Sequence, residues 1–424
     1  MENRYDKYKD SGIAWIGEIP EHWNIGYVGK FLNEVNNRNT SQKEANTLQF
    51  KMGEIVSKSD GNSKYNPESI ESYNIVYPGT IMINGLNLSF DFVSQRVGLV
   101  KERGAITSAY LAMKPNDNCS PNYVTYLFKS YDYKKVFHSL GKGLRATLNY
   151  NIIRNELIVL PSFHEQQTIA AYLDQKCGEI DELITLQEEM ITKLQSYKQS
   201  VITEAVTKGL NKNVPLKDSG IEWIGEIPEH WNICQLKRCA NIINGYAFNS
   251  NHFSKDLGVP VIRIGDIINE MVSFENIVYV QGNNELDKFQ VHKNDILIAM
   301  SGATVGKIGI YDIEDKAYVN QRVGIIRTKQ YGFIKRMFAT YGFANYVTLS
   351  SAGSAQPNIS SDGILNFYIP LPPISEQQTI ADYLDQKCSE IDELISIKQQ
   401  KIEKLKEYKK SLIFECVTGK RKVY

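Results

Sequence analysis

The sequence lacks long apolar runs. No stretch approaches the roughly eighteen apolar residues of a membrane-spanning helix, and residues 1–12 contain no apolar core like that of a signal peptide. Both absences predict a cytoplasmic protein with no membrane contact. Cysteine is scarce too, since six cysteines are scattered over 424 residues without a Cys-x-x-Cys pair. A disulfide framework and a cysteine-based zinc site are therefore not expected.

Familiar catalytic motifs are also missing. The sequence contains no G-x-G-x-x-G and no Asp/Asn-Pro-Pro-aromatic motif of the kind that amino-methyltransferases use. The nearest approach to a phosphate-binding loop is SGATVGKI at residues 301–308, where only three residues separate Gly302 from Gly306 and Ile308 replaces the required hydroxyl. We interpret this segment as a glycine turn between two strands that presents Lys307. The six histidines form no pair at metal-ligand spacing. The sequence therefore predicts a non-enzymatic chain with no catalytic residue, metal or cofactor of its own.

A net charge of one sign is absent as well, because 48 basic residues balance 48 acidic residues. The balance hides a partition along the chain. Residues 27–160 hold sixteen bases against eleven acids, and residues 233–374 hold thirteen against eleven. Residues 218–232 hold four acids and no base. The positive surplus in the two longer sections permits a polyanionic partner.

What the sequence does contain is a duplication. Residues 165–184 and 376–395 differ at only two of twenty positions, and residues 11–25 and 219–233, SGI-x-WIGEIPEHWNI, differ at one. The chain is thus a tandem repeat with a period of about 210 residues. All four tryptophans belong to the shorter repeated segment, the Trp motif. We expect this motif to pack against helices, with His22 and His230 in structural roles.

Each repeat ends in a predicted helix that runs unbroken to Gly209 or Gly419. Apolar residues recur at steps of three and four, which favours a coiled-coil seam, although two separately packed amphipathic helices would show a similar pattern. The predicted seam consists of Ile180, Leu183, Leu194, Tyr197 and Val201 in the first helix and Ile391, Leu394, Leu405, Tyr408 and Leu412 in the second. The first helix is acidic near its start and the second is lysine-rich near its end, which favours an antiparallel pair.

The repeats define the predicted domain boundaries. They are 1–26 for the N-terminal Trp motif, 27–160 for a first variable domain, 161–209 for the central helix, 210–232 for a linker with the second Trp motif, 233–374 for a second variable domain, and 375–424 for the C-terminal helix. Both variable sections read as mixed α/β, with strands expected at 72–83, 96–100, 110–113, 259–264, 295–300, 307–311 and 323–327, and helices at 123–129 and 333–344. Weak parallels link the two sections, including Gly-rich turns at 141–145 and 353–358.

These features together resemble the specificity subunit of Type I restriction–modification systems. The resemblance rests on the duplicated E-Q-Q-T-I-A-x-Y-L-D helices, the duplicated Trp motifs and the two divergent sections, and it covers essentially the whole chain. Residues 353–358, 371–374 and 376–378 are especially typical. The resemblance implies an α/β fold class, with two α/β target recognition domains joined by a long antiparallel two-helix coiled coil in a pseudo-twofold tandem repeat.

The resemblance also implies function and partners. In that family each recognition domain reads one half of a bipartite site in double-stranded DNA. The repeated helices space the domains and dock two modification (methyltransferase) subunits, and restriction (translocase/nuclease) subunits join this core. S-adenosylmethionine, ATP and magnesium would then be bound only by the partner subunits.

DNA sequence is read at base edges by donors and acceptors such as Arg, Lys, Asn and Gln, while phosphate contacts set the register. We therefore expect DNA contacts from Asn84, Asn87, Arg96, Lys142 and Arg145 in the first domain and from Arg263, Lys307, Gln321, Arg322, Gln356 and Asn358 in the second. The two Gly-rich turns stand out, because glycine lets the backbone approach a ligand closely.

Two other functions fit the sequence. The chain could serve as the specificity partner of a modification-only or fused-nuclease system. It could also be a coiled-coil adaptor without a DNA role, although the basic surplus in both domains argues against this. Identification of the proteins that co-purify with the chain would separate the three functions.

Overall fold

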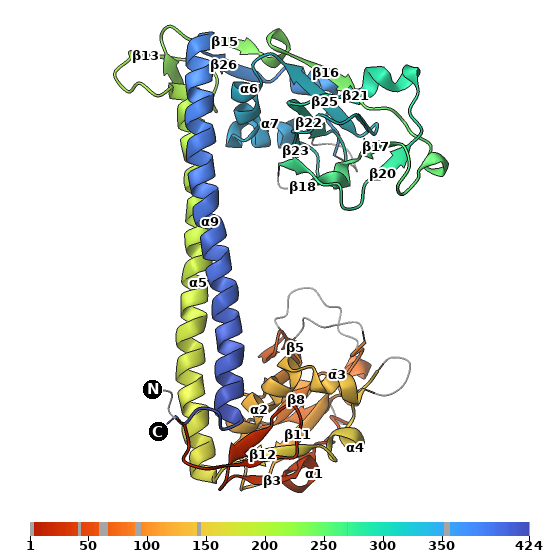
Figure 1. The fold of residues 1–424 in the computed structure, drawn as a ribbon, viewed down its shortest axis with the longest axis vertical. Helices are drawn as coiled ribbons and strands as arrows, with labels where there is room; N and C mark the ends of the chain where they lie inside the picture. Colours follow the sequence, from red (N-terminus) through yellow and green to blue (C-terminus); the bar gives the residue numbers. More distant parts are fainter. Residues whose placement is uncertain are drawn as a thin grey trace. The chain divides into compact units, whose positions relative to one another are not determined.

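In the computed structural model, residues 4–40, 44–58, 67–89, 95–141, 146–268, 270–351 and 357–423 are described. The chain divides into two compact units. The first consists of Met1–Glu188 with Gln399–Tyr424, and the second of Glu189–Lys398. The boundary falls inside both long helices, α5 (Phe163–Lys208) and α9 (Ile374–Val417), so each unit contains the start of one helix and the end of the other (Figure 1). Among the described residues, no helix has the length and apolar character needed to cross a membrane.

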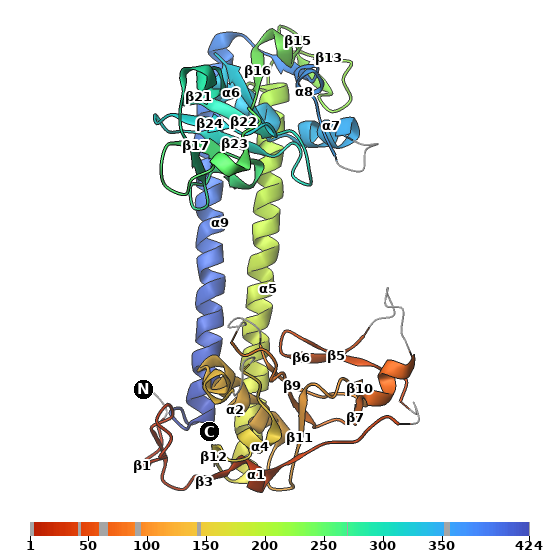
Figure 2. The ribbon, with the colours of Figure 1, turned by 90° about the vertical axis from the view of Figure 1, so that its right-hand side faces the viewer.

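The first unit contains a four-stranded antiparallel sheet with smaller strand pairs around it (Figure 2). The sheet has the order β4 (Leu32–Glu34), β11 (Leu111–Pro115), β8 (Ile81–Ile83) and β9 (Val97–Leu99). The pairs are β1 (Tyr8–Asp10) with β2 (Glu18–Pro20), β3 (Asn24–Tyr27) with β12 (Leu157–Leu160), β5 (Leu48–Lys51) with β6 (Glu54–Ser57), and β7 (Asn74–Val76) with β10 (Gly104–Ile106). The short helices are α1 (Val28–Phe31), α2 (Pro121–Tyr133), α3 (Val136–Leu140) and α4 (Tyr150–Ile153).

The second unit contains a six-stranded sheet and a four-stranded sheet. The larger has the order β16 (Ala240–Asn244), β25 (Val323–Thr328), β22 (Asp295–Ala299), β23 (Ile308–Tyr311), β19 (Met271–Val272) and β18 (Ile267–Ile268). The smaller has the order β20 (Val278–Val280), β17 (Val259–Ile262), β24 (Ala317–Val319) and β21 (Gln290–Val291). Two pairs, β13 (Leu216–Asp218) with β14 (Glu226–Pro228) and β15 (Asn232–Gln235) with β26 (Tyr368–Leu371), and helices α6 (Tyr331–Phe338), α7 (Tyr341–Ser351) and α8 (Ser361–Leu365) complete the unit.

The predicted α/β class is confirmed in both units. Each strand expected in the second domain is present to within two residues, as β17, β22, β23 and β25. The single strand expected at 72–83 is instead two strands, β7 and β8. The chain turns between them at Gly79, whose positive φ of 87° is easily adopted only by glycine. The helix expected at 333–344 is likewise divided into α6 and α7.

Helix α2 shows how local sequence sets an element and ties it into the core. Ser120 caps its N-terminus by accepting a hydrogen bond from the Tyr123 backbone N at 3.5 Å, and Pro121 occupies the first turn, where no N–H is needed. Tyr123 is fully buried, and its hydroxyl lies 3.1 Å from the carbonyl oxygens of Val159 in β12 and Val417 at the end of α9. The hydroxyl therefore links α2 to β12 and to the end of α9.

The two long helices run antiparallel in each unit. In the first unit, Lys409 Nζ of α9 lies 2.6 Å from both carboxylate oxygens of Asp181 in α5. In the second, Lys198 Nζ of α5 lies 2.8 and 2.7 Å from the two carboxylate oxygens of Asp392 in α9. Each aspartate lies in the first half of its helix and each lysine in the second half of the other. The predicted antiparallel orientation is confirmed.

The seam differs from part of the predicted set. Its positions are separated by four and three residues in turn and are buried or half-buried: Leu173, Cys177, Ile180, Ile184, Gln187, Ile191, Leu194 and Lys198 in α5, and Leu384, Cys388, Ile391, Ile395, Lys398, Ile402, Leu405, Lys409 and Leu412 in α9. Five predicted residues, Ile180, Leu194, Ile391, Leu405 and Leu412, lie in this series, and the half-buried Val201 adjoins it. The assignment of the other four to the seam is wrong, because the exposed fractions of their side chains lie between 43% and 58%: Leu183, Tyr197, Leu394 and Tyr408.

The four displaced residues share one offset. Each of the four precedes a seam position by one residue, which turns it by about 100° around the helix axis. At two of those seam positions the sequence has lysine, Lys198 and Lys409, rather than an apolar residue. The aliphatic stem of lysine packs in a seam while its ammonium reaches an acid on the other helix. A search for apolar residues alone therefore selects the neighbouring tyrosine.

The repeated Trp motif joins the start of one long helix to the end of the other within each unit. In the first unit, the buried Trp23 donates from Nε1 to Glu165 Oε1 in the first turn of α5, at 3.1 Å, and its ring packs against Gly419 just beyond α9. His22 Nε2 lies 3.0 Å from the other oxygen of the same carboxylate. The motif thus packs against the helices as predicted.

The second unit repeats this arrangement. Trp231 Nε1 donates to Glu376 Oε2 in α9 at 2.9 Å, its ring packs against Gly209 just beyond α5, and His230 Nε2 lies 2.6 Å from Glu376 Oε1. Gly209 and Gly419 have φ values of 72° and 71°, so glycine ends each helix where the indole closes over it.

Replacing Trp23 with phenylalanine is expected to loosen this junction. The change removes an N–H donor from the buried Glu165, which costs about 1–3 kcal/mol. Amide hydrogen exchange in the first turns of α5 should accelerate by about tenfold or more. Trp15→Phe is the matched control, since the half-buried Trp15 forms no hydrogen bond through its indole N–H among the described residues. Equal exchange in the two variants would contradict the role assigned to the indole N–H.

Candidate nucleic-acid interface

One end of the six-stranded sheet gathers several loops of the second unit. Because neighbouring strands are antiparallel, β16 and β22 end there and β23 and β25 begin there. Met300 N donates to the Arg322 carbonyl oxygen, and Gly302 N donates to the Pro357 carbonyl oxygen, both at 2.9 Å. We call this end the second-unit edge and define it as residues 244–246, 299–307, 320–323 and 357–361.

Four of the predicted DNA-binding residues lie exposed at this edge: Lys307, Gln321, Arg322 and Asn358. Within the described ranges, none of these side chains forms a hydrogen bond or an ion pair. Their donors and acceptors are therefore available to base edges and phosphates. Residues 301–308 do form a glycine turn between β22 and β23, with the exposed Lys307 at its end, as predicted. The fifth candidate, Gln356, lies outside the described residues.

Arg263 does not present its guanidinium in this way. The guanidinium pairs with Asp266 through two hydrogen bonds, Nε to Oδ2 at 3.0 Å and Nη2 to Oδ1 at 3.1 Å. Nη2 also donates to the carbonyl oxygen of Asn276 at 2.6 Å. Asp266 is buried, so the arginine neutralises an internal carboxylate and holds the turn after β17. The hydrogen bonds to Asp266 and Asn276 therefore occupy the guanidinium of Arg263, which is not presented to DNA as predicted.

The first unit has a corresponding edge where β8 ends and β9 begins. We call it the first-unit edge and define it as residues 84–88 and 146–149. Leu88 N donates to the Ala146 carbonyl oxygen at 3.0 Å, and Leu148 N donates to the Gly85 carbonyl oxygen at 2.9 Å. Asn84 is half-buried, whereas Asn87 is exposed in a left-handed conformation, with a φ of 50°. Lys142 and Arg145 were predicted in the adjoining turn and lie outside the described residues.

Arg96 was also predicted to contact DNA, but its side chain is only 1% exposed. Nη1 of its guanidinium donates to the carbonyl oxygens of Asn84 and Leu86 at 2.9 and 2.8 Å, and its backbone N donates to Asp132 Oδ2 at 2.9 Å. Burial raises the pKa of Asp132, although the nearby Arg96 opposes this rise. Arg96 is therefore placed to fix the shape of the loop at residues 84–86 and not to reach a base edge.

The two edges share one backbone pattern. Asn84 N donates to the Arg96 carbonyl oxygen at 2.8 Å, and Ala299 N donates to the Lys307 carbonyl oxygen at 2.9 Å. The next links are Leu148 N to the Gly85 carbonyl oxygen in the first unit and Ile359 N to the Met300 carbonyl oxygen in the second, both at 2.9 Å. Arg96 and Lys307 thus hold equivalent positions. Arg96 is buried and Lys307 is exposed, so the same backbone pattern presents different side chains in the two units.

The comparisons with known proteins agree with this two-unit arrangement. Residues 228–407 match the family model described as the Type I restriction modification DNA specificity domain. The sequence is 27% identical to the Type I restriction enzyme MjaVIII specificity subunit of Methanocaldococcus jannaschii, over 96% of this chain and 94% of that relative. Over almost its whole length, the chain is similar to specificity subunits of Type I restriction–modification systems.

Two solved structures share the fold of this chain. One is a chain from a study of complex assembly and conformational transition in the type I R-M system, with a TM-score of 0.72 and 15% identity over 94% of this chain and 98% of that one. The other is the HsdS subunit from Thermoanaerobacter tengcongensis, with a TM-score of 0.50 and 15% identity over 95% of this chain and 98% of that one.

Several other polar groups at the second-unit edge were not predicted from the sequence. Ser361 Oγ donates to Asn244 Oδ1 at 2.6 Å, which joins the end of β16 to the start of α8. Tyr246 is 42% exposed and forms a backbone bridge with Asn320. These residues are separated by 70 to 120 positions in the chain, so no local pattern links them. Neither β16 nor α8 was predicted from the sequence, so no predicted element pointed to these residues.

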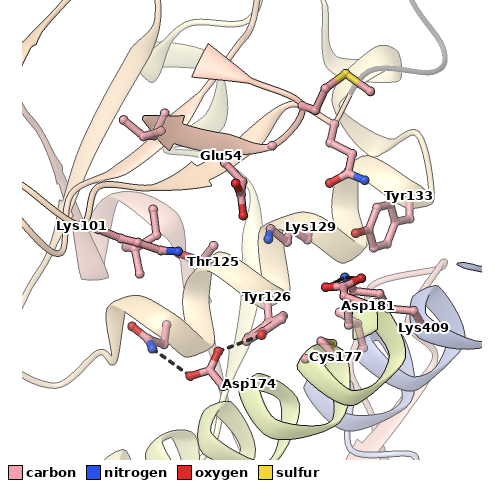
Figure 3. Close-up of a pocket in the computed structure, with 18 residues that line it drawn as sticks. Glu54, Lys101, Thr125, Tyr126, Lys129, Tyr133, Asp174, Cys177, Asp181 and Lys409 are labelled. Atoms are coloured by element: carbon pink, nitrogen blue, oxygen red, sulfur yellow. Dashed lines mark hydrogen bonds and ion pairs between the residues drawn. The ribbon is translucent and has the colours of Figure 1, made fainter. Parts of the chain in front are cut away.

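Each recognition domain is fastened to the long helix that follows it. In the first unit, Asp174 of α5 accepts hydrogen bonds from Tyr126 Oη at 2.8 Å and from Asn122 Nδ2 at 3.1 Å, both in α2. Figure 3 shows this contact at the wall of a polar cavity of about 590 Å³ between α2, α5, α9 and the β5–β6 pair. Lys129 also lines the cavity, and burial is the main cause that lowers its pKa.

In the second unit the equivalent residue is Asp385 of α9. It pairs with Lys335 Nζ at 3.0 Å and with the Arg336 guanidinium, both in α6. Burial acts to raise the pKa of Asp385, but hydrogen bonds from Arg336 and Lys335 outweigh burial and hold the pKa below its usual 3.8. The lysine and arginine are the more buried partners, so the carboxylate satisfies charges that α6 brings to the helix.

The lowered pKa gives a pH-dependent prediction. A carboxylate whose pKa is lower in the folded state stabilises the fold above its unfolded pKa, and this stabilisation is lost as pH falls through the folded pKa. Asp385→Asn is therefore expected to lower the melting temperature of the second unit by about 1–3 °C at pH 7. The difference from the wild type should shrink as pH falls below the usual aspartate pKa of 3.8 and disappear once pH is below the folded-state pKa. Asp382→Asn, one turn earlier on α9, is the control, because Asp382 is exposed and forms no ion pair among the described residues. A difference that persists unchanged at low pH would contradict the ion-pair assignment.

Proposed function

We propose that this chain is a specificity subunit and reads a two-part target in double-stranded DNA, one part through each edge. The observation that supports this most directly is the shared backbone pattern of the edges combined with their different exposed side chains. A constant frame places reading groups at an equivalent position in each domain, and the variable side chains set base preference. At the second-unit edge, Arg322 suits guanine, and Gln321 and Asn358 suit adenine, because these side chains match the major-groove edges of those bases. Lys307 supplies charge toward phosphate.

The repeats supply two equivalent surfaces for modification subunits. The first-unit stripe consists of Leu183 and Leu186 of α5 and Tyr408 of α9, all exposed. Leu183 follows Asp174 by nine residues, which places it about 180° around the helix from the recognition domain. The stripe therefore lies on the free side of the coil. Exposed apolar groups that gather on one face mark a protein interaction site.

The second-unit stripe is the same surface in the other repeat. It consists of Leu394 and Ile397 of α9 and Tyr197 of α5, again all exposed. Each residue of one stripe has its counterpart 211 positions away in the other. Two equivalent surfaces on one chain support the binding of two copies of one partner. Restriction subunits then join the resulting core.

The chemistry belongs to the partners in this proposal. The purified chain is expected to transfer no methyl group from S-adenosylmethionine and to bind DNA weakly and with strong salt dependence. The complex with modification subunits is expected to select, from randomised duplexes, two short conserved segments separated by unread base pairs. A single continuous motif would contradict two-part reading, and no sequence selection by any complex would favour an adaptor without a DNA role. Methyl transfer by the chain alone would contradict the non-catalytic role.

A further inference from the structure

Two cysteines of the second unit lie close enough to react with each other. Cys234 in β15 and Cys239 just before β16 have their sulfur atoms 3.9 Å apart, as free thiols. Both are half-buried, whereas Cys119, Cys177, Cys388 and Cys416 are buried. The pair lies within the second recognition domain, and the proposed function does not use it.

The first repeat shows independently that these two positions face each other. The residues equivalent to Cys234 and Cys239 are Gly26 and Phe31, each 208 positions earlier. The Phe31 ring lies directly over Gly26, since a Cβ added to that glycine would be 2.6 Å from the ring. The contact is filled by an aromatic ring in one repeat and by two thiols in the other.

A shared anchor fixes the turn between the two positions in both repeats. Val28 is fully buried in the first repeat, and its backbone N donates to the Glu156 carbonyl oxygen at 2.8 Å. Leu236 is its counterpart in the second repeat, also fully buried, and donates to the Phe367 carbonyl oxygen at 2.9 Å. The proximity of the thiols therefore follows from the backbone of the turn, which both repeats share.

The environment of the pair gives the two thiols different roles. The contact with Cys239 lowers the pKa of Cys234, burial opposes this, and the charge of Arg238 adds to the lowering. The same contact, together with burial, raises the pKa of Cys239. The thiolate is the reactive form of cysteine, and the positive charge of Arg238 favours that form at Cys234, so we assign Cys234 as the nucleophile and Cys239 as the second thiol. The four buried cysteines have raised pKa values, with burial as the largest cause, and are the less reactive set.

We propose that Cys234 and Cys239 form a dithiol site that peroxide converts reversibly into an intrachain disulfide. The Cys234 thiolate attacks one oxygen of hydrogen peroxide, the O–O bond breaks, and a sulfenic acid forms with release of hydroxide. Cys239 then attacks the Cys234 sulfur, the S–S bond forms, and the sulfenic oxygen leaves as hydroxide, which takes up the Cys239 proton and becomes water. The proton that Cys234 lost on ionisation neutralises the hydroxide released in the first step. Two thiols lose two electrons in total, and one peroxide becomes two waters. A thiol restores the pair by exchange.

The site is confined to one recognition domain. The disulfide would connect β15, which pairs with β26 beside the Trp motif, to the start of β16 in the sheet that carries the second-unit edge. The first repeat has no thiol at either equivalent position, so oxidation marks only the second domain. In a reducing compartment, disulfides that do form are mostly transient and redox-sensing, which suits a half-buried pair better than a structural bridge.

The test treats the full chain with limiting hydrogen peroxide, blocks free thiols with an alkylating agent and maps peptides by mass spectrometry. We expect one linkage, Cys234–Cys239, to form about tenfold or more faster than modification of any buried cysteine. Dithiothreitol should reverse it. Cys239→Ser should instead accumulate a sulfenic acid at Cys234 that dimedone traps, and Cys234→Ser should abolish the fast reaction. These serine variants alter half-buried groups, and their far-ultraviolet circular dichroism should match that of the wild type.

Other results would overturn the proposal. If Cys234 were oxidised to sulfinic acid without forming the linkage, the two positions would not meet in solution. If the buried cysteines reacted at the same rate as Cys234, the site would have no selectivity. If Cys239→Ser formed no trappable sulfenic acid while the wild type still formed the linkage, the assignment of Cys234 as the nucleophile would be wrong.

Discussion

Replacing Leu183 and Leu186 with glutamate is expected to reduce the number of bound modification subunits from two to one. Burial of two leucines contributes about 3–6 kcal/mol, and burying carboxylates in their place adds a desolvation cost. The loss should exceed a hundredfold in affinity at that surface. Native mass spectrometry of the complex with excess partner would count the bound subunits directly.

The repeat provides a built-in comparison for this experiment. Leu394→Glu with Ile397→Glu should remove one subunit in the same way, and the fourfold variant should bind none. Thr185→Glu adds one negative charge, half the change of the double variant, at an exposed position on the other side of α5 and should leave two subunits bound. A wild-type complex that stays at one partner per chain with excess partner present would contradict two equivalent surfaces.

Charge reversal at the second-unit edge, with Lys307→Glu and Arg322→Glu, is expected to abolish selective binding of one half of the target. Each side chain is exposed and without a protein partner among the described residues, so its loss removes DNA contacts without breaking the fold. Loss of a bidentate base contact costs about 1–3 kcal/mol. Each lost phosphate contact should also reduce the salt slope of binding by about 0.9. Titrations of the assembled complex at several salt concentrations would measure both effects.

A matched control lies at the opposite ends of the strands. Lys293 precedes β22 and pairs with Glu314, and Lys316 precedes β24 and pairs with Asp287. Lys293→Glu with Lys316→Glu makes the same change in net charge, and exposed ion pairs contribute little to stability. This variant should keep both half-sites. Lys142→Glu with Arg145→Glu is expected to affect the other half of the target, and loss of the same half in both experiments would contradict the assignment of one domain to each half.

The sequence predicted the parts of this fold that depend on repetition and on charge order. Two copies of one helix, acidic early in one and basic late in the other, leave antiparallel pairing as the favourable arrangement. The ion pairs Asp181–Lys409 and Lys198–Asp392 are that arrangement in atomic detail. The Trp motif was predictable for a similar reason, because its tryptophans recur at fixed distances from the helices.

The predicted DNA contacts of individual side chains failed where the position of a side chain depends on residues distant in sequence. Arg96 is buried by the loop at residues 84–86 and lies against Asp132, and neither contact is visible in a local pattern. Its counterpart Lys307 meets no such acid and stays exposed. Arg263 could have been judged better from sequence, because its partner Asp266 is only three residues away. The four segments of the second-unit edge meet because of the order of the strands in the sheet. That order is decided by packing between segments far apart in the chain.

Methylation mapping is the most direct test of whether each edge reads its own half of the DNA target. The modification subunits would be expressed with the wild-type chain or with the variant Gln321→Ala, Arg322→Ala, and the methylated motif would be read from genomic DNA. We expect a bipartite methylated motif for the wild type. For the variant we expect a motif that is relaxed in one half only, with the other half and the spacer unchanged. An identical motif, or relaxation in both halves, would show that the second-unit edge does not read its own part of the target.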